Sequence, residues 1–114
     1  MARLPNAEKA IIEADKIYGY ILSPSHPIGR FKAAFFRRHG YSANKWESFE
    51  RRLRELILSQ DITLIEESQY GLKYIIEGPL TSASGEAVPI VTVWVILKGE
   101  DIPRFITAYP GGLR

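Results

Sequence analysis

Residues 25–33 (SHPIGRFKA) carry the side chains of this chain that are best suited to phosphate chemistry. Proline favours the first position of a helix, so Pro27 predicts that His26 stands at a helix N-terminus. Imidazole can take or give a proton near neutral pH, and the ammonium of Lys32 follows in the same helix. This spacing predicts a polyanion site, and a histidine that only caps the helix or shapes the turn is the plainer alternative.

A second group of polar side chains lies in a strand near the end of the chain. Strand alternation places Phe105, Thr107 and Tyr109 on one face, so the two hydroxyls can point into one cleft. Arg104 falls on the other face and needs a β-bulge, or its place at the strand start, to join them. Threonine and tyrosine are also ordinary strand residues, which is the alternative explanation for their presence.

The helix that follows His26 is predicted to bury one stripe of side chains. Apolar residues recur there at helical spacing: Ile28, Phe31, Phe35 and Phe36. Lys32 falls inside this stripe. A lysine in that place either extends past its packed stem to water or is held facing an anion or a carboxylate. The nearby imidazole favours the second alternative.

Positive charge is concentrated in the first half of the chain. Residues 1–60 hold eleven Lys and Arg against six Asp and Glu, whereas residues 61–114 hold four against seven. Such asymmetry can mark a face that binds nucleic acid, although solvated helix surfaces also use arginine. Within the helix after His26, the candidates for binding phosphates are Arg30, Arg37 and Arg38.

Hydrophobic periodicity predicts helices up to about residue 60. Asp15 is a plausible N-cap for a short helix whose inward side chains are Ile17, Ile21 and Leu22. The second helix runs from Pro27 to about His39, with Gly40 as its stop. A third begins at Asn44, where Glu47 reaches back as in a capping box, and it buries Trp46, Phe49, Leu53, Leu56 and Ile57.

From Asp61 onward the apolar period changes to that of strands. Apolar residues alternate first at Ile62 and Leu64 and then at Leu72, Tyr74 and Ile76. Residues 88–97 are apolar on both faces and predict a central strand, and residues 102–109 predict the last one. We therefore expect an α+β fold in a single domain (1–114), with a helical part (2–60) and a four-stranded antiparallel meander (61–110).

Several classes of site are disfavoured by what the sequence lacks. There is no cysteine for a disulfide or a thiolate zinc site, and the two histidines do not share a metal-ligand spacing. No glycine-rich phosphate loop is present, so we expect neither a metal nor a nucleotide cofactor. No apolar run approaches the roughly 18 residues of a spanning helix and no export signal opens the chain, which leaves cytoplasmic residence as the expectation.

Five segments together resemble a bacterial family of uncharacterised small domains. They are residues 4–10 (LPNAEKA), 26–33 (HPIGRFKA), 70–74 (YGLKY), 93–94 (VW) and 103–110 (PRFITAYP). The family occurs alone and at the C-terminal tips of polymorphic toxins, and it resembles the barnase–EndoU–colicin–RelE group of metal-independent ribonucleases. The chain departs from the EndoU-like pattern by offering one catalytic histidine where those sites use two.

The resemblance implies an endoribonuclease that acts by internal transphosphorylation on RNA, without a cofactor. His26 would then draw the proton from a 2′-hydroxyl, while Lys32 and Arg104 stabilise the phosphate charge. Thr107 and Tyr109 would orient the scissile group, and the three arginines of the helix would hold flanking phosphates. The alternative is a non-catalytic binding protein of a toxin–antitoxin or regulatory pair. As a toxin the protein would have a cognate antitoxin or immunity protein as a partner, whereas as a binding protein it would use the same basic helix to bind an acidic partner.

Overall fold

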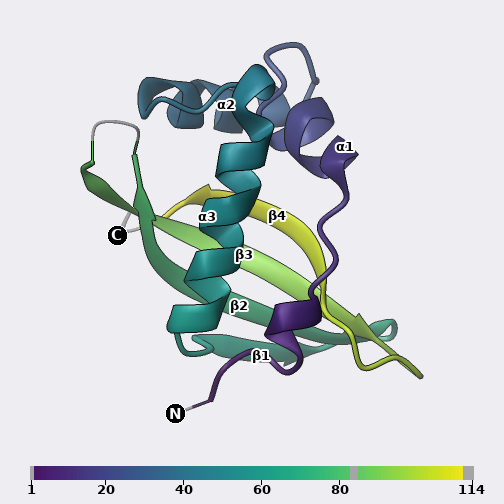
Figure 1. Ribbon diagram of the computed structural model, residues 1–114. Coiled ribbons are helices and arrows are strands. Elements are labelled where there is room, and N and C mark those ends of the chain that lie inside the picture. The colour runs from purple at the N-terminus through teal and green to yellow at the C-terminus, as the bar shows by residue number, and fades with distance from the viewer. Residues whose placement is uncertain (1, 83–84, 112–114) are drawn as a thin grey trace.

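The computed structural model describes residues 2–82 and 85–111, and the helical elements in this part precede the sheet (Figure 1). The helical elements are η1 (Ala7–Lys9), α1 (Ala14–Lys16), η2 (Ile17–Ile21), α2 (Gly29–Arg38), η3 (Ala43–Lys45) and α3 (Trp46–Ser59). The strands are β1 (Leu64–Glu67), β2 (Gly71–Thr81), β3 (Ala87–Leu97) and β4 (Arg104–Pro110). The strands lie in the order β1-β2-β3-β4 and each pairs antiparallel with the next, so the predicted α+β meander is confirmed.

The hydrophobic core lies between the sheet and the helices, with α3 lying across the sheet and packing on β2 (Figure 1). As predicted, β3 is an inner strand with a mostly buried central stretch. Its Trp94 is fully buried, and the indole donates a hydrogen bond to Thr92 Oγ1 at 2.9 Å. Thr92 in turn donates to the carbonyl of Ile76 at 2.9 Å. A buried polar group without a hydrogen bond destabilises the folded state, and these two bonds satisfy the indole N–H and the hydroxyl of Thr92.

Two of the predicted helix caps are wrong. Asp15 lies inside α1, and the N-cap position belongs to Glu13, whose side chain makes no capping bond. Asn44 lies inside the 3₁₀ turn η3, so α3 begins at Trp46 and no capping box forms. The chain enters α1 from extended backbone at Glu13, whose carbonyl accepts a hydrogen bond from the amide of Lys16 at 2.9 Å. It enters α3 through η3, in which the amide of Lys45 donates to the carbonyl of Ser42 at 2.8 Å.

Helix α2 begins two residues later than predicted. It starts at Gly29 because Pro27 and Ile28 form the turn that leads into it. It ends at Arg38, and Gly40 follows with a φ of 93°, the left-handed conformation that glycine adopts most readily. The predicted glycine stop is therefore confirmed.

The buried face of α2 differs from the predicted stripe. Ile28 and Phe31 are 63% and 69% exposed, so their expected burial is wrong. The buried residues of α2 are instead Gly29, Ala33 and Phe36. Two of the three are small, and small residues let the helix approach its neighbour closely. This rotation brings the side chain of Lys32 toward the body of the protein, where it is half-buried.

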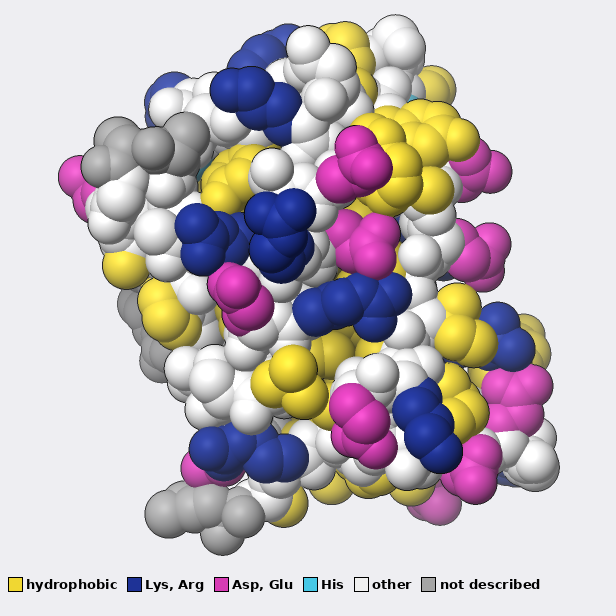
Figure 2. All heavy atoms as spheres, in the orientation of Figure 1, with side chains coloured by type: hydrophobic (Ala, Val, Ile, Leu, Met, Phe, Trp, Pro, Cys, Tyr) yellow, Lys and Arg dark blue, Asp and Glu magenta, His cyan; other side chains and the backbone are white. Residues whose placement is uncertain are grey.

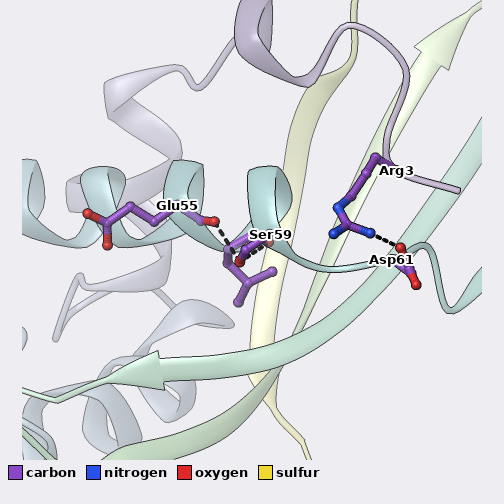
Figure 3. A network of polar contacts seen from close by, with 5 residues as sticks. Arg3, Glu55, Ser59 and Asp61 are labelled. Atoms are coloured by element: carbon purple, nitrogen blue, oxygen red, sulfur yellow. Dashed lines mark hydrogen bonds and ion pairs between the residues drawn. The ribbon is translucent and has the colours of Figure 1, made fainter. Parts of the chain in front are cut away.

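The first strand of the sheet is an exposed edge. All four residues of β1 are exposed, including Leu64, whereas Ile62 just before it packs against the core. Polar contacts hold the start of the chain against this edge: Arg3 forms an ion pair with Asp61 (Figure 3), and the amide of Ile62 donates to the carbonyl of Ala2 at 2.8 Å. No helix in the described residues is long and apolar enough to cross a membrane.

Candidate active site

Tyr20 is placed by an uncommon helical turn. In η2 the amide of Leu22 donates to the carbonyl of Ile17 at 2.8 Å, which is the i→i+5 bond of a π-helix. Such turns are rare and occur often at functional sites. Ile17 and Ile21 are fully buried and anchor the turn in the core. The ring of Tyr20, on another side of the turn, is left half-buried beside α2.

Gly29 allows η2 and α2 to touch. A Cβ atom at this position would lie 2.0 Å from the carbonyl oxygen of Tyr20 and 3.0 Å from its ring Cδ1. No side chain can occupy that space unless one of the two elements moves. The glycine therefore sets the distance between Tyr20 and the side chains that α2 carries.

The central contact of the site is made by Lys32. Its Nζ donates one hydrogen bond to Tyr20 Oη at 2.8 Å and another to Thr107 Oγ1 at 3.1 Å. One ammonium thus connects η2, α2 and β4. Both of these partners carry hydroxyl groups, and neither is a carboxylate.

The surroundings of Tyr20 favour its ionised form. The Lys32 ammonium, by its hydrogen bond to the phenol oxygen, lowers the pKa of Tyr20 below its ordinary value. A hydrogen bond with Thr107 and the positive charges of Lys32 and Lys16 act in the same direction, whereas burial opposes them. The phenolate is therefore more accessible at neutral pH than that of an ordinary tyrosine.

His26 caps α2 with its side chain. Its Nδ1 accepts hydrogen bonds from the amides of Ile28 and Gly29, both at 3.0 Å. Two donors aimed at Nδ1 place the proton of the neutral ring on Nε2. The imidazole packs edge-on against the ring of Tyr20, with centroids 4.9 Å apart. Its Nε2 is thus a hydrogen-bond donor, an arrangement that fits donation to an anion better than the general-base role expected from the sequence.

Tyr20, His26 and Thr107 border a cleft of about 520 Å³, whose lining does not include Lys32 itself. It is lined by Asp15, Lys16, Gly19, Tyr20, His26, Ile106 and Thr107. The acid in this wall interacts with Tyr18, whose pKa it raises by a hydrogen bond and by its charge. The remaining polar lining consists of a cation, an imidazole and two hydroxyls, which can together hold an anion of phosphate size.

A β-bulge in β4 decides which side chains of the strand share a face. Alternate residues of β3 lie opposite the three predicted side chains: Val95 opposite Arg104, Val93 opposite Thr107 and Val91 opposite Tyr109. The register shifts between Val93 and Trp94, so Ile106 is the extra residue. The bulge that Arg104 required is present. It also separates Phe105, which packs on Trp94 in the core, from Thr107, so the predicted common face of those two residues is wrong.

The structure brings only part of the predicted catalytic set together. Lys32 and Thr107 are hydrogen-bonded, and His26 joins them through the ring of Tyr20. Arg104 instead forms an ion pair with Glu100 at 3.2 Å and does not line the cleft among the described residues. Tyr109, 37% exposed, shares the sheet face of Thr107 but is likewise outside this lining.

The arginines predicted to bind phosphates are exposed on one side of α2. Arg30, Arg37 and Arg38 all reach solvent, and the guanidinium of Arg30 lies 4.8 Å from the ring centre of Phe31. Dark-blue side chains are visible at the upper edge of Figure 2, where α2 lies in Figure 1. On α3, by contrast, two arginines pair with acids of the same helix, Arg52 with Glu55 and Arg54 with Glu50. Compared with α3, helix α2 is therefore the better candidate for binding a polyanion.

Tyr20 is the residue that sequence reasoning missed. It lies four residues after Lys16, which is one helical turn, and that spacing was the available signal.

No group of three or more His, Asp or Glu within residues 2–82 and 85–111 is arranged to hold a metal ion. The polar side chains that line the cleft are hydroxyls, an imidazole, an ammonium group and the carboxylate of Asp15.

The cap at the start of α2 can be tested separately from any activity. Replacing His26 by Ala removes the acceptor of two amides, and we expect the free energy of unfolding to fall by about 1 kcal/mol. His26→Asn supplies another capping oxygen and should retain most of this stability. Urea denaturation of both variants measures the difference. Equal stability of the alanine variant and the wild type would contradict the capping role.

No curated protein matches this chain. The fold is similar to that of a chain in a "contact-dependent growth inhibition toxin - immunity protein complex from Klebsiella pneumoniae 342", with a TM-score of 0.67 and 22% identity over 94% of this chain and 97% of that chain. A family model described as a domain of unknown function, DUF6883, matches residues 3–112. The chain therefore belongs to the DUF6883 family.

Proposed function

We propose that this protein is a metal-independent endoribonuclease that cleaves RNA by internal transphosphorylation. The observation that carries the proposal is the Lys32 ammonium, which donates hydrogen bonds to two residues that line the cleft, Tyr20 and Thr107. The cleft is large enough for a phosphodiester. A fixed cation and hydrogen-bond donors that face a small polar cleft can stabilise the charge of a pentacovalent phosphate. The 2′-hydroxyl of RNA supplies an internal nucleophile, so no nucleophilic side chain is required.

In this proposal each side chain has a role that follows from its contacts. Lys32 and Lys16 neutralise the phosphate charge, and the Nε2–H group of His26 donates to a non-bridging oxygen. The Thr107 hydroxyl orients the scissile group from β4. Arg104 and Tyr109 share the sheet face of Thr107, and we assign them to the adjoining nucleotide, where the arginine must exchange its bond to Glu100 for a phosphate.

The exposed side of α2 extends this site. Arg30, Arg37 and Arg38 can bind flanking phosphates without reading base identity. No acidic residue occurs in α2, Gly29–Arg38, so these charges have no acidic neighbour within the helix itself. We infer a surface along which the strand continues beyond the cleft.

The structural likeness supports a setting in a toxin system and also leaves room for a second function. The similar chain comes from a complex of a toxin and an immunity protein. A catalytic role would make a cognate immunity protein the partner of this chain. A non-catalytic role would make it the binding component of such a pair, with the cations of α2 contacting an acidic partner.

Cleavage assays separate the two functions. The purified protein should cut RNA in excess chelator, leave DNA of the same sequence intact and produce 2′,3′-cyclic phosphate ends, because only RNA carries the internal nucleophile. The His26→Asn variant, purified in the same way, keeps the helix cap but lacks the Nε2–H group. Its rate of RNA cleavage should be lower by about 10²- to 10³-fold. This variant also controls for contaminating nucleases. Protein that binds RNA without cutting any substrate would replace the catalytic proposal with the binding one.

A further inference from the structure

We propose that Tyr20 is the proton acceptor of the reaction, taking the proton of the attacking 2′-hydroxyl onto its phenol oxygen. This inference rests on the proposed function and names a catalytic residue for it. It follows from three observations: the hydrogen bonds of His26, the hydrogen bonds that converge on Tyr20, and the position of that tyrosine in the lining of the cleft.

The hydrogen bonds of His26 remove it from consideration as the base. Its Nδ1 lone pair is directed at the amides of Ile28 and Gly29, so the proton of the neutral ring sits on Nε2. A base at Nε2 would need the opposite tautomer, with an Nδ1–H group facing two N–H donors 3.0 Å away. That arrangement would lose both capping bonds and set donor against donor. His26 therefore acts at the cleft as a donor.

Tyr20 has the opposite arrangement, with a donor directed at its oxygen. Lys32 donates to Oη at 2.8 Å, and the same ammonium reaches Thr107 at 3.1 Å. A phenolate is an acceptor-only oxygen, so a charged donor stabilises it more than it stabilises the phenol. The geometry thus prepares this oxygen to exist without its proton and to receive one.

The ionisable groups around Tyr20 come from α1, from α2 and from the turn before α2, where His26 packs edge-on against its ring. Lys16 of α1 and Lys32 of α2 favour the phenolate, and together with the Thr107 bond they lower the pKa of Tyr20 in spite of its partial burial. Asp15 of α1 also lines the cleft, but its interaction is with Tyr18. The lining residues from β4, Ile106 and Thr107, carry no charge.

The reaction step is balanced with water as the only additional species. The phenolate oxygen of Tyr20 takes the proton of the 2′-hydroxyl while the 2′-oxygen forms a bond to phosphorus. The bond from phosphorus to the 5′-oxygen breaks with its electron pair, and that oxygen takes a proton from water. The resulting hydroxide removes the proton from the phenol, which restores the phenolate beside Lys32. The products are a 2′,3′-cyclic phosphate and a 5′-hydroxyl.

Replacing Tyr20 by Phe tests this role because it removes one oxygen and keeps the ring. Loss of a positioned base should lower the single-turnover rate by about 10²- to 10⁴-fold. The wild-type rate should rise with pH and level off below the ordinary tyrosine pKa near 10, because the phenolate fraction grows as the pH rises and the surroundings lower the pKa of Tyr20. In the phenylalanine variant this rise should disappear. Affinity for RNA with a 2′-deoxy substitution at the cleavage site should be unchanged.

Tyr18→Phe is the matched control. Tyr18 is an exposed tyrosine two residues away whose phenol interacts with Asp15, so its loss should leave both the rate and the pH profile at wild-type values. If the wild type cleaves RNA and Tyr20→Phe retains its rate and its pH dependence, the inference is overturned while the ribonuclease proposal stands. If the wild type cleaves no RNA under any condition, the proposed function is overturned and the inference falls with it.

Discussion

Replacing Lys32 by Met is expected to lower the rate of RNA cleavage by about 10²- to 10³-fold, because it removes the fixed cation of the site. Methionine keeps much of the unbranched stem, so the packing of α2 should survive. The variant loses the donor of two hydrogen bonds, to Tyr20 at 2.8 Å and to Thr107 at 3.1 Å. Single-turnover cleavage measured across pH gives the effect.

The pH profile of this variant should move in a defined direction. Lys32 lowers the pKa of Tyr20, so its removal raises that pKa and leaves less phenolate at neutral pH. The rise in rate should therefore shift to higher pH than in the wild type. Lys45→Met, which removes an exposed lysine of η3, should keep the rate within about twofold. A Lys32→Met protein with wild-type rate and profile would rule out the central role of this ammonium.

Replacing Gly29 by Ala is expected to destabilise the protein and to impair the site together. The added Cβ would lie 2.0 Å from the carbonyl oxygen of Tyr20, and both groups belong to helical backbone that cannot move freely. Overpacking of this kind costs about 2–3 kcal/mol, which corresponds to a fall of roughly 10 °C in Tm for a chain of this size. Any relief must separate η2 from α2, which moves Tyr20 away from Lys32. Thermal denaturation and cleavage assays measure the two effects.

A second glycine provides the control for stability. A Cβ at Gly19, one residue before Tyr20, would meet no heavy atom within 4 Å. Gly19→Ala should therefore leave Tm unchanged or raise it, because alanine reduces the conformational freedom of the unfolded chain. Equal Tm values for Gly29→Ala and Gly19→Ala would show that the close approach at Gly29 is not required.

Much of the fold could be predicted from periodicity. The helical spacing of Phe49, Leu53 and Ile57 predicted α3, and all three side chains are fully buried. The change of period near Asp61 predicted the antiparallel meander, which the register confirms. These elements depend on which faces are apolar, a property that local sequence carries directly.

The helix starts were less predictable because alternative backbone arrangements compete there. Asp15 and Asn44 are good capping residues, but each of them lies inside a helical turn and not at the residue that precedes one. The face of α2 was mispredicted because the helix approaches η2 closely at Gly29, and it buries the small side chain of Ala33 while the bulkier Phe31 is turned outward. The hydrophobic pattern of the sequence does not show how closely two helical elements will approach, so it could not predict which face of α2 is buried.

For the site, the sequence by itself determined the chemical inventory: an imidazole before a helix, a lysine within it and hydroxyls on a late strand. Only the tertiary structure decided which of them meet. The contact between Lys32 and Thr107 spans 75 positions, and it depends on the packing of α2 and on a bulge that changes the facing of β4. The tautomer of His26 and the role of Tyr20 were likewise set by neighbouring backbone and by a charged donor from another element. Local sequence specifies periodicity and residue chemistry, whereas distances between elements follow from how their surfaces fit together.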